Sequence, residues 1–138
     1  MSIPKRTEEP ALHVLFVCTG NICRSPTAER LATAFGAELR IPDFTASSAG
    51  TRAMIGHPMH PEAARVLTAL GGDPSGFAAR QLTAKAASSV DLVIAMTRVH
   101  RDSVLELAPR QLRRTFTLIE AARLVSEFGA QDVVDLAT

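Results

Sequence analysis

A cysteine and an arginine stand six positions apart near the start of the chain, among residue types that can bind and attack an anion. The segment reads Val14-Leu-Phe-Val-Cys18-Thr-Gly-Asn-Ile-Cys-Arg24-Ser-Pro26. An arginine guanidinium is a planar, permanently charged fork that matches two oxygens of a phosphoryl group. The positive field that holds such an anion also favours a thiolate, so we expect Cys18 to be a nucleophile.

The elements around this segment are expected to form an anion-binding loop. The apolar run that ends at Cys18 predicts a β-strand, and Pro26 suits the first turn of a following helix. Backbone N–H groups of such a loop can point inward, and a helix start adds unpaired donors and the positive end of its dipole. The predicted phosphate-binding residues are therefore Thr19, Gly20, Asn21, Ile22, Cys23, Arg24 and Ser25.

The string from Cys18 to Pro26 resembles the signature of the low-molecular-weight protein tyrosine phosphatase family, in its bacterial branch. The resemblance implies hydrolysis of phosphotyrosine-type monoesters in protein substrates through a cysteinyl-phosphate on Cys18. Arg24 and the loop amides would stabilise the equatorial oxygens, and Ser25 would hydrogen-bond the thiolate. No metal and no cofactor are expected, because the loop itself supplies the positive charge.

Alternating apolar patterns predict a single α/β domain over residues 11–138, preceded by a mobile tail at residues 1–10. Strands separated by helices imply right-handed crossovers and a parallel sheet covered on both faces. The resemblance implies a doubly wound, four-stranded sheet of order 2-1-3-4. Expected strands are 12–18, 44–48, 90–96 and 115–118, and expected helices begin at Pro26, Pro61, Thr83, Arg98 and Ile119.

The resemblance also implies roles for residues in two further segments. Ser48 stands where the family has a serine that hydrogen-bonds the loop asparagine, here Asn21. Phe77 stands where a supporting histidine is common, so Asn21 is expected to find another partner. The loop at residues 52–60 is expected to wall the substrate pocket, or to tuck against the core, through its apolar residues Met54, Ile55 and Met59.

The composition argues against several other classes of function. A formal net charge of +1 over 138 residues argues against a nucleic-acid partner, and no apolar run is long enough to span a membrane. The chain is therefore expected to be cytoplasmic. Its two cysteines, Cys18 and Cys23, fit a reducing compartment. They either form a reversible disulfide on oxidation, or Cys23 is simply a small buried hydrophobe.

Three alternative functions remain open. Thioredoxin-linked arsenate reductases share this loop but need further cysteines, and none follows Cys23. Arginine phosphatases of this family tend to carry threonine where this chain has Ile22. A catalytically weak module that only binds phosphate or phosphotyrosine is the third alternative, because the general acid is uncertain in the sequence.

The general acid of the family lies in an Asp-Pro segment near the C-terminus. Asp135 stands at a similar separation from Cys18, but Leu136 follows it instead of proline. A second alignment, based on the segment from Phe116 to Leu124, puts the acid beyond Thr138. We expect Asp135 to be an inefficient acid, so that p-nitrophenyl phosphate is hydrolysed far better than phosphotyrosine.

Overall fold

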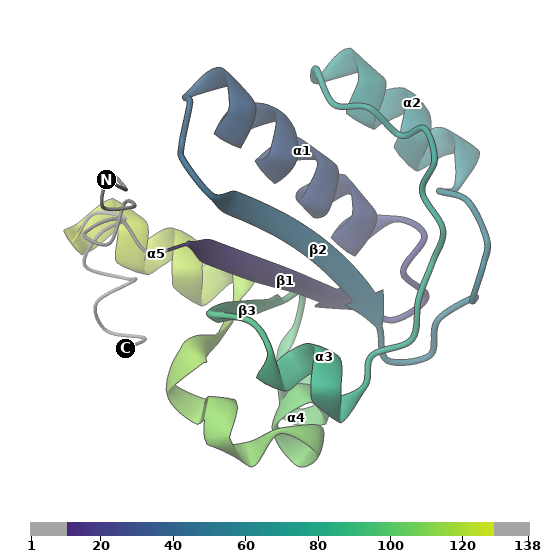
Figure 1. Ribbon diagram of the computed structural model, residues 1–138. Coiled ribbons are helices and arrows are strands. Elements are labelled where there is room, and N and C mark those ends of the chain that lie inside the picture. Colours follow the sequence, from purple (N-terminus) through teal and green to yellow (C-terminus); the bar gives the residue numbers. More distant parts are fainter. Residues whose placement is uncertain (1–10, 129–138) are drawn as a thin grey trace, which may run out of the picture.

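A parallel sheet of four strands forms the centre of the computed structural model, which describes residues 11–128 (Figure 1). Its strands are β1 (Leu12–Cys18), β2 (Phe44–Gly50), β3 (Leu92–Ala95) and β4 (Thr115–Thr117). They lie in the order β2-β1-β3-β4, and each neighbouring pair is parallel. The predicted fold class and strand order are confirmed.

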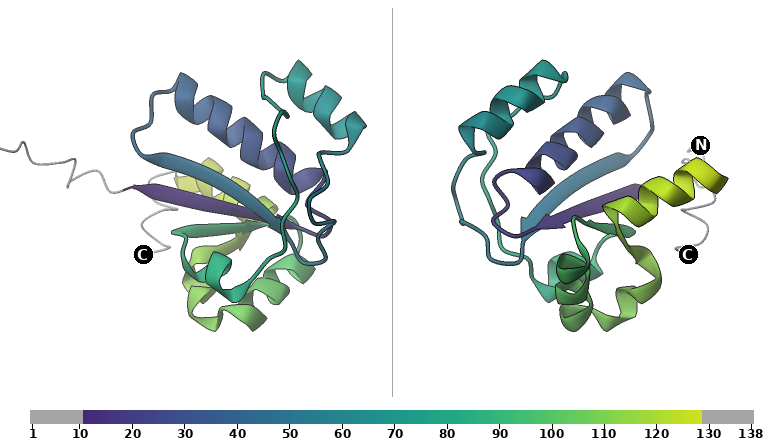
Figure 2. Two further views of the ribbon diagram at one scale, coloured as in Figure 1. Left: turned by 45° about the vertical axis from the view of Figure 1, so that its right-hand side comes forward. Right: turned by 180° about the vertical axis from the view of Figure 1, so that it is seen from behind.

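Helices cover both faces of this sheet (Figure 2). One face carries α1 and α5 with α2 outside α1, and the other carries α3 and α4. The helices are α1 (Arg24–Glu38), α2 (Pro61–Ala69), α3 (Ala84–Ser88), α4 (Arg98–Leu107) and α5 (Leu118–Phe128). A 3-10 helix, η1 (Pro109–Arg114), joins α4 to β4 and was not expected from the sequence.

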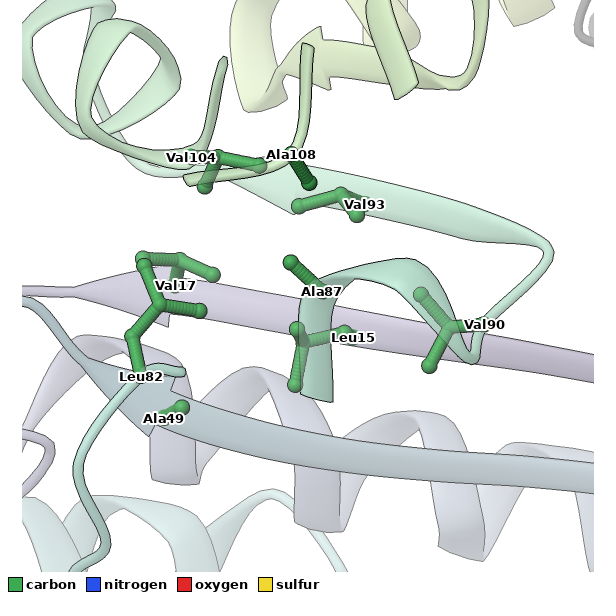
Figure 3. Close-up of a cluster of buried hydrophobic side chains, with 9 residues drawn as sticks. All are labelled: Leu15, Val17, Ala49, Leu82, Ala87, Val90, Val93, Val104 and Ala108. Carbon is green, nitrogen blue, oxygen red and sulfur yellow. The ribbon is translucent and has the colours of Figure 1, made fainter. Parts of the chain in front are cut away.

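The central strand β1 is apolar on both sides because the sheet is covered on both sides. Leu15 and Val17 are fully buried and pack with Val93 and Val104 on the side of α3 and α4 (Figure 3). The alternate residues of β1 pack on the opposite face with side chains of β2, β3, β4 and α5. This two-sided burial holds β1 at the centre of the fold, and Cys18 is its last residue.

A third apolar cluster packs between α1 and α2 and places the loop that follows β2. Met59 is 4% exposed and belongs to this cluster, with Leu67 and Phe77. Its place in the core excludes it from the pocket wall, which was one of its two expected roles. Met54 and Ile55 are exposed instead, at 44% and 68%.

The carboxyl ends of the parallel strands meet at one edge of the sheet, where ligands bind in open α/β folds. The loop after Cys18, the segment after Gly50 and the start of α4 all lie at this edge. Between residues 11 and 128, no helix combines the length and the apolar character needed to cross a membrane.

Candidate active site

The loop between β1 and α1 turns its carbonyl groups toward the surrounding protein. Each of the following carbonyls accepts a backbone N–H from a later segment of the chain. The pairs are Cys18 with Thr51 (2.9 Å), Thr19 with Arg52 (2.9 Å), Gly20 with Met54 (3.0 Å), Ile22 with His60 (2.8 Å) and Cys23 with Thr27 (3.1 Å). Within residues 11–128, the backbone N–H groups from Thr19 to Ser25 have no acceptor. A row of free N–H groups ending at a helix N-terminus is an anion-binding arrangement.

Asn21 holds the loop in its curved form. Its backbone is left-handed, with φ of 59°, a conformation that asparagine tolerates better than most residues. Its buried side-chain amide donates to Ser25 Oγ (2.8 Å) and Ser48 Oγ (3.0 Å). The side-chain oxygen of Asn21, Oδ1, accepts a hydrogen bond from the backbone N–H of Arg80 (2.9 Å). The expected bond to Ser48 is present, and Arg80 supplies the other partner that Phe77 cannot.

A chain of hydrogen bonds with a fixed direction ends at the Cys18 sulfur. The Glu29 carboxylate can only accept, so Ser48 donates to it over 2.7 Å. The Ser48 oxygen then accepts one amide proton of Asn21, and Ser25 accepts the other. The hydroxyl proton of Ser25 is left for Cys18 Sγ, 2.9 Å away. A donor aimed at sulfur stabilises the charged thiolate.

Arg30 holds Glu29 at the far end of this chain. Its Nε lies 2.9 Å from the Glu29 carboxylate, and both side chains are mostly buried. The same guanidinium donates to the carbonyls of Asp73 (2.9 Å) and Ser75 (2.8 Å) and stacks over the Phe77 ring at 5.5 Å. Sequence reasoning missed this ion pair. Adjacent helix residues do not normally face each other, so no spacing in the sequence pointed to this pair.

Arg24, the first residue of α1, is exposed and forms no ion pair with any other described residue. Its free guanidinium therefore contributes an uncompensated positive charge beside the loop. Burial, and after it the charge of Arg24, lowers the pKa of His100 below its ordinary value. His100 was also missed from the sequence, and its ring contacts Thr19 and Thr97. The signal was the spacing of Thr97 and His100, since a helix-capping threonine faces the residue three positions later.

Apolar surface adjoins the charged loop. Met54 lies against Gly20 on one side. On the other side, Cys23 and Arg24 border a groove of about 690 Å³ that also involves Met96 and Leu118. An anion cradle beside apolar walls suits a phosphate ester with an apolar leaving group.

The remaining predicted residues are placed as follows. Cys23 is a free thiol, partly exposed, directly before α1, and its disulfide with Cys18 stays a prediction. Asp135 lies outside the described residues, so its role as general acid also stays a prediction. From residue 11 to residue 128, no three side chains of His, Cys, Asp or Glu gather as metal ligands.

Known proteins are similar to this chain in both sequence and fold. The chain is 40% identical to the low-molecular-weight protein-tyrosine-phosphatase Etp of Escherichia coli K12 over 102 residues, 74% of this chain and 66% of Etp. The crystal structure of such a phosphatase from T. tengcongensis has a TM-score of 0.75 at 32% identity, covering 92% of this chain and 95% of that one. A cysteine-to-serine mutant of the YwlE arginine phosphatase, with a phosphorylated active-site serine, has a TM-score of 0.74 at 26% identity, covering 91% of both chains.

These matches cover different shares of the chain and of its relatives. The chain spans just under two thirds of the length of the curated relatives it matches, such as 66% for Etp and 61% for Wzb of Salmonella typhi. The family model described as low molecular weight phosphotyrosine protein phosphatase matches residues 13–134, from β1 to a point beyond α5. The chain therefore belongs to the low-molecular-weight phosphotyrosine protein phosphatase family.

Proposed function

We propose that this chain is a cysteine-dependent phosphatase that hydrolyses phosphotyrosine-type monoesters in proteins. The observation that supports it best is the row of free N–H groups from Thr19 to Ser25, directly after a thiol that contacts the Ser25 hydroxyl. These donors fit the three non-bridging oxygens of a phosphoryl group, and Arg24 adds the fork that neutralises their charge.

The proposed reaction has two steps. The Cys18 thiolate attacks phosphorus in line, a P–S bond forms, and the ester P–O bond breaks as the leaving oxygen takes a proton. Water then attacks the phosphorus, the P–S bond breaks, and the thiolate returns with inorganic phosphate released. The Ser25 hydroxyl stabilises the thiolate at the start and at the end. Asp135 is the candidate proton donor of the first step.

The cytoplasm is the compartment that this chemistry requires, because reducing conditions keep Cys18 as a free thiol. We include a cytoplasmic location in the proposal for that reason. The partner is a phosphotyrosine-containing protein, and inorganic phosphate is the expected occupant of the loop after turnover.

Hydrolysis of phosphoarginine is the second candidate activity, since YwlE carries this activity in its name. Ile22 argues against it, because its apolar side chain packs against the cluster between α1 and α2 and brings no polar group to the loop. The test is to measure phosphate release from p-nitrophenyl phosphate, phosphotyrosine and phosphoarginine by wild type and Cys18→Ser. We expect wild type, and not Cys18→Ser, to release phosphate from the aryl ester p-nitrophenyl phosphate. Faster release from phosphoarginine would support the second candidate instead.

A further inference from the structure

His100 joins the first residue of the phosphate loop to the start of α4, although no step of the proposed reaction uses it. The imidazole is 5% exposed. Its Nε2 lies 2.8 Å from Thr19 Oγ1, and its Nδ1 lies 2.9 Å from Thr97 Oγ1. Both ring nitrogens are therefore held by hydroxyls, one from the end of β1 and one from the end of β3.

The capping of α4 sets the direction of these two bonds. Thr97 Oγ1 is the N-cap of the helix and accepts the backbone N–H of His100. We assign the proton of this hydroxyl to Nδ1, so that the neutral ring carries its single proton on Nε2 and donates it to Thr19. A neutral imidazole, which its buried position favours, has the one donor and one acceptor that this arrangement needs.

Thr19 is also held through its backbone. Its carbonyl accepts the N–H of Arg52 over 2.9 Å, and a Cβ added at Gly50 would overlap that same carbonyl oxygen. The end of β2 and the segment after it thus hold the main chain of Thr19, while His100 of α4 contacts its side chain. Cys18 precedes Thr19 directly, so these contacts control where the sulfur lies.

We propose that His100 is a positioning residue for the phosphoryl transfer described above: through its Nε2 bond to Thr19 it fixes the start of the phosphate loop, and with it Cys18, against α4. The inference rests on the proposed function. His100 itself touches no reacting atom, so its effect passes entirely through the hydroxyl of Thr19.

The contrast between His100→Gln and His100→Asn tests this inference. The glutamine amide reaches the position of Nε2 and can still donate to Thr19, whereas the asparagine amide reaches only the position of Nδ1 and keeps the contact with Thr97. We expect His100→Asn to lower kcat/KM for p-nitrophenyl phosphate about tenfold, and His100→Gln to stay within about threefold of wild type. A role limited to capping or packing α4 would give the opposite order or equal losses.

Thr19→Val removes the same bond from the other side, with little change in side-chain volume. It should reproduce the loss of His100→Asn, and the double variant should be no slower than either single variant. Losses that multiply in the double variant would overturn the inference. His13→Gln is the matched control, because His13 Nε2 also contacts a hydroxyl, Ser47 Oγ at 2.8 Å, near the other end of β1. It should leave turnover unchanged.

Two measurements distinguish a failure of this inference from a folding defect and from a failure of the proposed function. Thermal unfolding shows whether His100→Asn folds. If it does not, Thr19→Val alone tests the inference, and unchanged turnover in Thr19→Val would overturn it. If wild type shows no turnover, the proposed function fails, but orthovanadate binding by calorimetry still compares the variants. Weaker binding in His100→Asn than in His100→Gln would support the positioning role, and equal binding would contradict it.

Discussion

Ser48 donates a hydrogen bond of 2.7 Å to the carboxylate of Glu29, and this contact sets the direction of the bonds that lead to the catalytic candidate Cys18. A carboxylate has no proton to give, so the Ser48 oxygen is free to accept from Asn21. The sulfur therefore accepts a hydrogen bond from the Ser25 hydroxyl, because a carboxylate one helical turn farther along α1 accepts at the other end.

Ser48→Ala should lower kcat/KM for p-nitrophenyl phosphate about tenfold. The buried amide of Asn21 would lose an acceptor, and Ser25 would lose its fixed orientation toward sulfur. Steady-state kinetics check this. Ser47→Ala is the matched control, since Ser47 is the adjacent β2 residue and contacts His13 instead of the loop. Equal losses in the two variants would show that the chain of bonds does not act on Cys18.

Gly50→Ala should lower kcat about a hundredfold, because the new methyl group would overlap the Thr19 carbonyl oxygen and push the loop away from its catalytic geometry. Gly36→Ala is the control. Its methyl group would lie 2.7 Å from the Phe44 ring, far from the loop, and should cost about 1–3 kcal/mol of unfolding free energy without changing kcat. Urea unfolding and kinetics on both variants separate the two effects.

The stability of the fold should decrease as the pH falls below about 6.5. Because the pKa of His100 is lowered in the folded state, the unfolded chain binds more protons in the interval between the folded pKa and the ordinary value. The contribution of neutral His100 to the free energy of unfolding is therefore fully present above that interval and is lost on acidification through it. Urea titrations at several pH values check this. His100→Gln should show a shallower decrease, and an identical decrease would assign the effect to other groups.

Asp135→Ala should have little effect on hydrolysis of p-nitrophenyl phosphate, whose leaving group needs no proton. We also expect wild type to be slow on phosphotyrosine, because an efficient general acid contributes about 10²- to 10⁴-fold with a poor leaving group. The measurement is kcat/KM of both proteins on both substrates. A large drop confined to phosphotyrosine would show that Asp135 is an efficient acid after all.

Local patterns predicted the strands, the helices and the parallel α/β class of this chain, whereas the strand order came from the family resemblance. The apolar run ending at Cys18, proline and threonine at helix starts, and the continuous apolar strand before Met96 each depend on neighbours in sequence. The bond of Asn21 to Ser48 was predictable only through the family resemblance, because 27 residues separate the two side chains.

The rest of the site depends on contacts that local patterns do not report. Arg30 reaches the carbonyls of Asp73 and Ser75 across the gap between α1 and the segment after α2. His100 meets Thr19 from a position 81 residues later, and only the pairing of β3 with β1 brings them together. Arg30 sits on a helix pattern that is equally typical of a solvent-facing position. The spacing of Thr97 and His100 indicates a helix cap, but it does not indicate the contact of His100 with Thr19.

The most direct test of the proposed mechanism is mass spectrometry of the protein quenched in acid during turnover of p-nitrophenyl phosphate. The covalent intermediate predicts a mass increase of one phosphoryl group, located on the peptide that contains Cys18 and absent in Cys18→Ala. Arg24→Ala should lose both turnover and the adduct, because the guanidinium binds the phosphate and stabilises its transition state. Turnover that continues in Cys18→Ala, or an adduct on a residue other than Cys18 in wild type, would contradict the account.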